Sequence, residues 1–294
     1  MTAYRKRFGL AHDPLPRDAL GRSFYDADEC YARLRRSFSY LATVPGLGLL
    51  TGDAGSGKTA ALRNLCDQLP EPEYRIVYIC DTSVTPAAVY RNLAAALGLN
   101  PARQRDALWR QLKTTIEHLV DVEAVIPILV LDEAQHLPDS FFFDLAGFLN
   151  RNFDRRELLT VWLVGLPSLG ARLGMRQHAA LSSRVVSTNV MPVRGREDFM
   201  AMVEHGLKVA GAKTKLLSEQ AMELLWRVSH GLPKQASRLL RTSLVLAHER
   251  DQAFVDEHVM LDACEDLQLG RPTVSPKSAG SIQSRGQRGT KSRK

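Results

Sequence analysis

Gly52-Asp53-Ala54-Gly55-Ser56-Gly57-Lys58-Thr59 is the stretch of sequence that decides the fold. It fits the pattern GxxxxGK followed by Ser or Thr, in which glycines let successive backbone N–H groups curl around a phosphate without Cβ clashes. A short apolar run at 47–50 precedes it, and a helix is predicted from Ala60 to Leu69 directly after it. Because the start of a helix presents the positive end of its dipole to an anion, the segment from Gly52 to Ala60 predicts a site for nucleotide phosphates.

A second motif ends a buried strand. Residues 126–131 form a continuous apolar run, which is typical of a strand buried on both faces, and Asp132 and Glu133 follow at once. In such a pair of motifs Lys58 reaches the β- and γ-phosphates, while Thr59 and Asp132 hold Mg²⁺. Glu133 can act as the general base that activates a water. A carboxylate placed for water favours hydrolysis of ATP over phosphoryl transfer to a small molecule, with ATP and Mg²⁺ as cofactors.

Strands and helices alternate through the first two thirds of the chain. Strands are predicted at 47–50, 75–80, 126–131, 158–164 and 185–190, and helices at 28–41, 60–69, 86–97, 104–120 and around 141–149. This alternation predicts an α/β fold with a parallel five-stranded sheet. The room between Lys58 and Asp132 indicates that an additional strand lies between the strand before the phosphate loop and the strand that ends at Asp132. That arrangement is found in hydrolases that work as rings or other oligomers.

After Pro192 the strand patterns stop. Four helices are predicted, at 196–210, 218–229, 233–248 and 256–267. Ser218 suits the N-cap of the second, and Pro233 suits the first turn of the third. We therefore divide the chain into a loop-like lead-in, an α/β core, a small all-helical lid and a basic disordered tail. Their bounds are 1–27, 28–193, 194–270 and 271–294.

Composition and charge exclude several classes of protein. Hydrophobic residues make up 45% and charged residues 24% of the chain, which excludes a mostly disordered or collagen-like protein. The formal charge is +7, and seven of the 39 basic residues lie in 271–294 without any acid, so the 32 others balance the 32 acidic residues. The four cysteines lack zinc spacing, and no run approaches the roughly 18 apolar residues of a membrane span. We expect a cytoplasmic protein with no membrane partner.

These motifs resemble the AAA+ ATPases of the ExeA/TniB/TnsC type, which include MuB-like transposition proteins. The resemblance covers about residues 1–265. It rests on the opening from Tyr4 to Phe8-Gly9-Leu10 with Ser23-Phe24-Tyr25, on Leu131-Asp132-Glu133-Ala134-Gln135-His136-Leu137, on Leu163-Val164-Gly165-Leu166-Pro167-Ser168-Leu169 and on Gly231-Leu232-Pro233-Lys234. It implies a P-loop AAA+ core followed by a helical lid, with ATP bound at a subunit interface in a ring or helical homo-oligomer.

Two positions depart from the group's pattern. Leu166 stands where the group has Gln, so the first-sensor role, contact with the γ-phosphate or the attacking water, is open between Ser168 and Asn150. Lys234 stands where the group has a lid arginine, and it keeps the charge without the guanidinium fork. Arg238, one turn further on, is the alternative for this second-sensor role. The resemblance thus adds Lys234 and Arg238 to the nucleotide-binding residues.

The resemblance also implies an arginine finger that acts on a neighbouring subunit's nucleotide. Arg184, within Leu181-Ser182-Ser183-Arg184-Val185, matches its position and is the third catalytic candidate beside Lys58 and Glu133. Arg172 and Arg176 are alternatives.

For the biological role, the resemblance favours a transposition accessory protein. Such a protein is a slow ATPase, stimulated by DNA or a partner, that assembles with ATP on duplex target DNA without sequence preference and recruits or activates a DDE transposase. Two basic segments are candidate DNA contacts, the stretch from Arg103 to Lys113 and the tail at 271–294. One alternative is a nucleotide-gated switch that acts on a protein partner. The other is an ExeA-like secretion-associated ATPase, which we disfavour because such proteins carry a membrane segment after the ATPase region.

Overall fold

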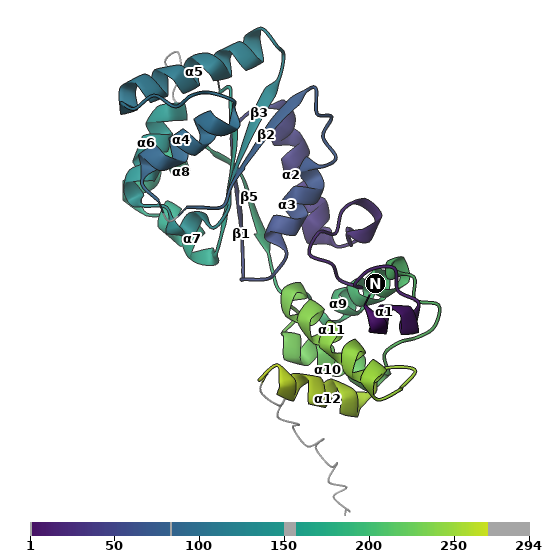
Figure 1. Ribbon diagram of the computed structural model, residues 1–294. Coiled ribbons are helices and arrows are strands. Elements are labelled where there is room, and N and C mark those ends of the chain that lie inside the picture. Colours follow the sequence, from purple (N-terminus) through teal and green to yellow (C-terminus); the bar gives the residue numbers. More distant parts are fainter. Residues whose placement is uncertain (1, 83, 150–156, 270–294) are drawn as a thin grey trace, which may run out of the picture.

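The computed structural model describes residues 2–82, 84–149 and 157–269. Within them, five parallel strands form one sheet in the order β2-β3-β4-β1-β5, which confirms the predicted α/β fold (Figure 1). The strands are β1 Leu47–Gly52, β2 Tyr74–Ile79, β3 Ile126–Leu131, β4 Thr160–Gly165 and β5 Val185–Met191. An additional strand does lie between β1 and β3, as predicted. It is β4, whereas β2, the strand between the two motifs in sequence, lies at the edge.

Helices cover both faces of the sheet (Figure 1). Leu129 and Leu131 belong to the apolar cluster on one face, and Ile128 and Val130 belong to the cluster on the other. One layer consists of α4 Pro86–Ala96, α5 Arg105–Asp121, α6 Asp139–Leu149, α7 Pro167–Leu173 and α8 Ala179–Ser182, and the other of α2 Glu29–Thr43 and α3 Lys58–Cys66. The two-sided burial explains why the central strands read as continuous apolar runs rather than as alternating ones.

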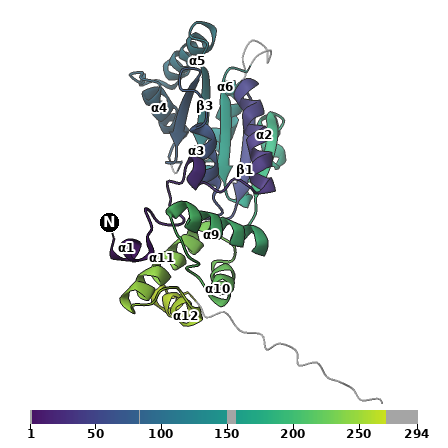
Figure 2. The same ribbon diagram turned by 90° about the vertical axis from the view of Figure 1, so that its right-hand side faces the viewer.

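The helical lid follows the sheet (Figure 2). Its helices are α9 Arg196–Ala210, α10 Glu219–Ser229, α11 Pro233–Glu249 and α12 Glu257–Asp266, and their inner faces form one apolar cluster. The Ser218 Oγ accepts a hydrogen bond from the Ala221 N–H at 3.1 Å, so Ser218 is the N-cap as predicted. Pro233 lies in the first turn of α11, where its missing N–H costs nothing.

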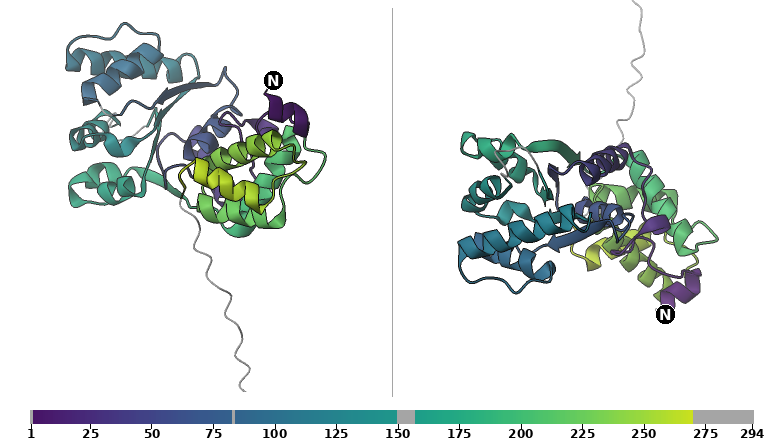
Figure 3. Two further views of the ribbon diagram at one scale, coloured as in Figure 1. Left: turned by 60° about the horizontal axis from the view of Figure 1, so that its bottom comes forward. Right: turned by 90° about the horizontal axis from the view of Figure 1, so that it is seen from above.

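The lead-in is only partly loop-like, which corrects the prediction. It contains α1 Ala3–Phe8 and a short 3-10 helix at Gly21–Ser23. Its apolar side chains Tyr4, Phe8 and Leu10 are buried in the apolar cluster of the lid, so the N-terminal helix lies beside that domain (Figure 3). A six-residue helix with three consecutive basic residues is too short to show a helical pattern in the sequence. Its apolar contacts come from the lid, which is distant in the sequence.

Three earlier expectations concern residues outside the described part. These are the tail at 271–294, residue 270 at the end of the lid, and Asn150 as a candidate first sensor. Among the described residues, no helix combines the length and the apolar character that crossing a membrane requires.

Candidate active site

The phosphate loop joins the end of β1 to the start of α3. Gly55 and Gly57 have φ of +86° and +104°, a region in which side chains with a Cβ are strained. Gly57 caps α3, whose first N–H groups have no partner inside the helix itself. The loop and the helix start therefore form a backbone site suited to an anion, as the glycine spacing predicted.

Lys58 lies inside this loop with 7% of its surface exposed. Its Nζ donates to the carbonyl oxygens of Gly52 and Asp53, both at 2.9 Å. Burial lowers the pKa of Lys58, and the carboxylates of Glu133, Asp132 and Asp53 oppose that shift. A largely buried ammonium that donates to two carbonyl oxygens attracts an incoming anion strongly, because little water screens its charge.

Asp132 joins the two motifs. Its Oδ2 accepts hydrogen bonds from the Thr59 hydroxyl at 2.6 Å and from the Tyr78 hydroxyl at 2.9 Å, and its Oδ1 accepts from the Glu133 N–H at 2.9 Å. Burial raises the pKa of Tyr78, with the nearby Asp132 adding to the effect, so the phenol stays a neutral donor. The prediction from sequence missed Tyr78; the signal was its place on β2, the strand beside β3.

Thr59 and Asp132 fit a magnesium site of the kind that phosphates complete. Among the described residues, no group of three or more His, Cys, Asp or Glu side chains could hold a metal by itself. Mg²⁺ in nucleotide sites typically takes one or two protein oxygens and fills its other positions with phosphate oxygens and water. A hydroxyl and a carboxylate in direct contact next to an anion-binding loop match that pattern.

Glu133 follows Asp132 at the carboxyl end of β3. Its backbone is left-handed, with φ of +53°, and its carbonyl accepts a hydrogen bond from the Thr82 hydroxyl at 2.7 Å. The side chain is exposed, and its Oε2 accepts from the Gln135 Nε2 at 2.6 Å. Gln135 is a further residue that was not predicted to belong to the site.

The lid reaches the phosphate loop through α11. The backbone N–H of Lys234 donates to the Gly55 carbonyl at 3.3 Å, while the Lys234 side chain is exposed. Arg238 is exposed on the same helix, one turn further on. Lys234 thus stands next to the loop, and no contact of Arg238 with the loop is present among the described residues.

Arg194, between β5 and α9, ties the lid to the core and was not predicted. Its Nη1 lies 2.8 Å from Asp28 Oδ2, and its N–H donates to the Gly231 carbonyl at 3.1 Å. The other Asp28 oxygen accepts from the Tyr31 N–H at 2.7 Å and so caps α2. This buried ion pair connects the start of α2 with the start of the lid.

The three arginine-finger candidates lie at different places in the core. Arg184 precedes β5 at the amino-terminal edge of the sheet, lies 3.6 Å from Glu157 and is 13% exposed. Arg172 donates to the carbonyls of Gln135 and Leu137 and pairs with Asp139. Arg176 is exposed in a short 3-10 helix at Arg176–His178.

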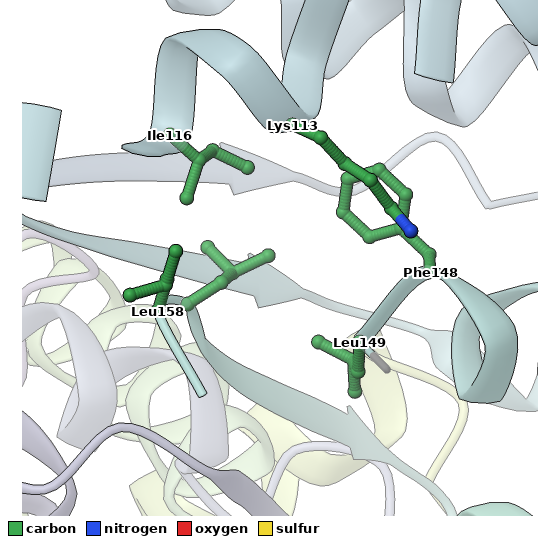
Figure 4. A pocket seen from close by; sticks show the side chains of 6 residues that line it. Lys113, Ile116, Phe148, Leu149 and Leu158 are labelled. Carbon is green, nitrogen blue, oxygen red and sulfur yellow. The ribbon is translucent and has the colours of Figure 1, made fainter. Parts of the chain in front are cut away.

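A small apolar pocket lies elsewhere, under α5 (Figure 4). Its lining is Lys113, Ile116, Phe148, Leu149, Leu158 and Leu159. The Lys113 Nζ lies 5.6 Å from the centre of the Phe148 ring, and the Arg105 guanidinium lies over Trp109 and pairs with Asp144. Two cations of the predicted basic segment therefore pack on the chain's own aromatic rings, while Arg103 and Arg110 are exposed.

The parallel sheet, the phosphate loop, Asp132 and the lid together define the P-loop AAA+ class of fold. Residues 42–173 match the family model of the AAA domain. Among solved structures, Cdc6p from Pyrobaculum aerophilum superposes with a TM-score of 0.69 at 17% identity, covering 91% of this chain and 72% of that one. The Aeropyrum pernix ORC1 protein, solved in complex with DNA, gives a TM-score of 0.66 at 21% identity, covering 91% and 71%.

A curated relative adds sequence similarity. General secretion pathway protein A of Aeromonas hydrophila is 29% identical over 252 residues, which is 84% of this chain. The chain spans 45% of the length of that protein. The comparisons thus support the AAA+ part of the resemblance and a relative named for secretion, whereas the transposition role stays a prediction.

Proposed function

We propose that this chain binds ATP with Mg²⁺ and hydrolyses it at the phosphate loop, and that it works as a homo-oligomer. The observation that carries the proposal is the 2.6 Å hydrogen bond from Thr59 to Asp132, which brings two motifs 73 residues apart into one site. A lysine held in the loop and an exposed carboxylate at Glu133 stand at the same edge of the sheet. This combination serves hydrolysis better than phosphoryl transfer, since a base for water is in place.

Each residue of the site has a distinct task. The loop N–H groups and Lys58 bind phosphate oxygens, and Thr59 with Asp132 holds the metal ion. Bound Mg²⁺ supplies charge neutralisation to the phosphates. The Glu133 carboxylate takes a proton from the attacking water. Lys234, at the loop, is the residue we assign to the second-sensor contact.

Phosphate release by the wild type, Lys58→Ala and Glu133→Gln tests the ATPase. We expect Glu133→Gln to bind ATP with wild-type affinity and to lose roughly 10²–10⁴-fold in turnover, because only proton removal is affected. Lys58→Ala should lose ATP binding itself. Glu219→Gln, an exposed carboxylate in the lid, is the matched control and should behave as the wild type. Wild-type turnover by Glu133→Gln would refute the assignment.

ATP-dependent binding to duplex DNA is the second part of the proposal. Two observations favour it: Arg103 and Arg110 are exposed on or beside α5, and a protein of the same fold, ORC1, was solved in complex with DNA. Recruitment of a DDE transposase is inferred from the resemblance alone. The secretion-associated role draws support from the similarity to general secretion pathway protein A.

Fluorescence anisotropy with a random-sequence duplex separates these roles. We would compare ATP, ADP and no nucleotide at two salt concentrations, for the full chain, a chain that ends at Gly270 and Arg103→Glu/Arg110→Glu. ATP-dependent, salt-sensitive binding that survives tail removal and is lost with the two arginines supports assembly of the core on DNA. Binding that ignores nucleotide and disappears with the tail reduces the tail to an electrostatic tether. An absence of binding favours a protein-directed switch or the secretion role.

A further inference from the structure

The side chain of Gln135 connects the ends of two neighbouring strands. Its Nε2 donates to the Glu133 Oε2 at 2.6 Å, and its Oε1 accepts from the N–H of Leu166, the first residue after β4, at 3.1 Å. A carboxylate can only accept and an N–H can only donate, so one orientation of the amide satisfies both contacts. The Gln135 amide therefore fixes the position of the Glu133 carboxylate relative to the end of β4.

The neighbouring residues make room for this amide and hold its backbone. A Cβ at Gly165 would clash with the Gln135 Oε1, so the amide keeps its present place only beside a glycine. The Gln135 carbonyl accepts from Arg172 Nη1 at 2.8 Å, and the same guanidinium binds the Leu137 carbonyl at 3.0 Å. Gln135 is thus fixed through both its main chain and its side chain.

The end of β4 is where the resemblance placed a polar first sensor, and Leu166 has no polar side-chain atom. Gln135 brings an amide to that place from the 3-10 turn Ala134–His136, which follows the adjacent strand β3. We propose that Gln135 is the positioning residue for Glu133 and performs the first-sensor role. This inference rests on the proposed ATPase function of the site.

The hydrogen-bond geometry explains how Gln135 would act. The bond to Oε2 orients the Glu133 carboxylate, so that Oε1 is the oxygen that accepts the proton of the attacking water. An oriented base and an orienting third group are the arrangement that activated nucleophiles share. The amide carries a second hydrogen, which an oxygen of the γ-phosphate or of the water can accept. One residue thereby couples the presence of the γ-phosphate to the position of the base.

Gln135→Ala and the isosteric Gln135→Glu test the proposal in the full chain. We expect ATP affinity to stay within about 2-fold and kcat to fall roughly 10- to 100-fold, the range seen when an orienting hydrogen-bond partner is removed. Gln135→Glu should be impaired as well, because its carboxylate keeps the size of the amide but cannot donate a hydrogen bond to Glu133. His136→Ala, an exposed neighbour, is the control and should match the wild type in kcat and ATP affinity.

A double-mutant cycle with Gly165→Ala adds a readout that a general structural role would not move. Gly165→Ala should reproduce the loss of kcat by displacing the amide, and should cost little more in the Gln135→Ala background. Additive losses would overturn the coupling. Wild-type kcat in Gln135→Ala, in a protein that Glu133→Gln inactivates, would overturn the positioning role. Equal phosphate release by the wild type and Glu133→Gln would instead refute the ATPase function and the inference with it.

Discussion

The backbone N–H of Lys234 donates to the carbonyl oxygen of Gly55 at 3.3 Å, so the first turn of the lid helix α11 lies directly on the phosphate loop. A Cβ at Gly55 would come within 3.0 Å of the Lys234 Cβ, in addition to the strain of φ at +86°. The glycine is therefore required twice, by the loop conformation and by the close approach of the lid. This contact places one cationic side chain, Lys234, at the loop and leaves Arg238 one turn away.

The contact predicts which lid cation senses nucleotide. Lys234→Ala keeps the backbone bond and removes the ammonium, so turnover should fall about 10-fold while stability changes by less than about 0.5 kcal/mol, as for other exposed positions. Lys234→Arg should retain activity. Phosphate release and thermal melting measure the two effects. A larger loss of turnover in Arg238→Ala than in Lys234→Ala would assign the second-sensor role to Arg238.

The burial of Lys58 predicts how the stability of the folded chain depends on pH. Burial lowers its pKa below the ordinary value of 10.5, so the charged form is less favourable in the folded than in the unfolded chain. At pH 7 the lysine is protonated in both states and the full cost of burial is present. That cost disappears as the pH rises from the folded pKa towards 10.5. Lys58→Met should therefore match or exceed the wild type in Tm at pH 7 without nucleotide.

Two comparisons complete this test. The Tm gain that ATP gives the wild type should be absent in Lys58→Met, because the phosphate contact is lost. Lys208→Met, at an exposed lysine of α9, should change neither the Tm without nucleotide nor the Tm gain from ATP. A Tm for Lys58→Met well below the wild type in the absence of nucleotide would show that the two bonds to loop carbonyls outweigh the burial cost.

The Arg194–Asp28 pair predicts a large and non-additive loss of stability. Both side chains are mostly buried, at 12% and 6% exposure. Removing the guanidinium in Arg194→Met leaves a buried charge unpaired, which costs about 3–5 kcal/mol. Adding Asp28→Asn should recover part of that loss, because the amide oxygen can still cap α2. Denaturant unfolding measures the cycle.

A more exposed ion pair within the lid serves as the comparison. Arg196 lies 2.7 Å from Glu223 with half of its side chain exposed, so Arg196→Met should cost only about 0–1 kcal/mol. Equal losses in Arg194→Met and Arg196→Met would mean that burial does not strengthen the Arg194 contact.

The motifs and the strands that carry them were predictable, whereas the contacts between them were not. The run 126–131 matches β3 residue for residue, because a strand buried on both faces leaves an uninterrupted apolar signature. Tyr78 reaches Asp132 only because β2 pairs with β3 in a register that sets Ile79 beside Leu131. Gln135 reaches the end of β4 across 31 residues, and Arg194 reaches Asp28 across 166. Such contacts depend on strand order and domain packing, which periodicity in one segment does not encode.

Arg184 yields the prediction that tests the oligomer. It stands at the amino-terminal edge of the sheet, whereas Lys58 and Glu133 stand at the carboxyl edge, so within one chain it cannot complete their site. If it acts on a neighbour's nucleotide, Arg184→Ala should bind ATP normally and lose roughly 10³–10⁵-fold in turnover. Mixing it with Glu133→Gln should restore activity, because about a quarter of the interfaces of a head-to-tail assembly then pair an intact Glu133 with an intact Arg184. Arg176→Ala, tested in the same way, identifies the finger if Arg184→Ala turns over normally. Two inactive variants that stay inactive when mixed, despite forming mixed oligomers, would show that Arg184 acts within its own subunit, through its contact with Glu157.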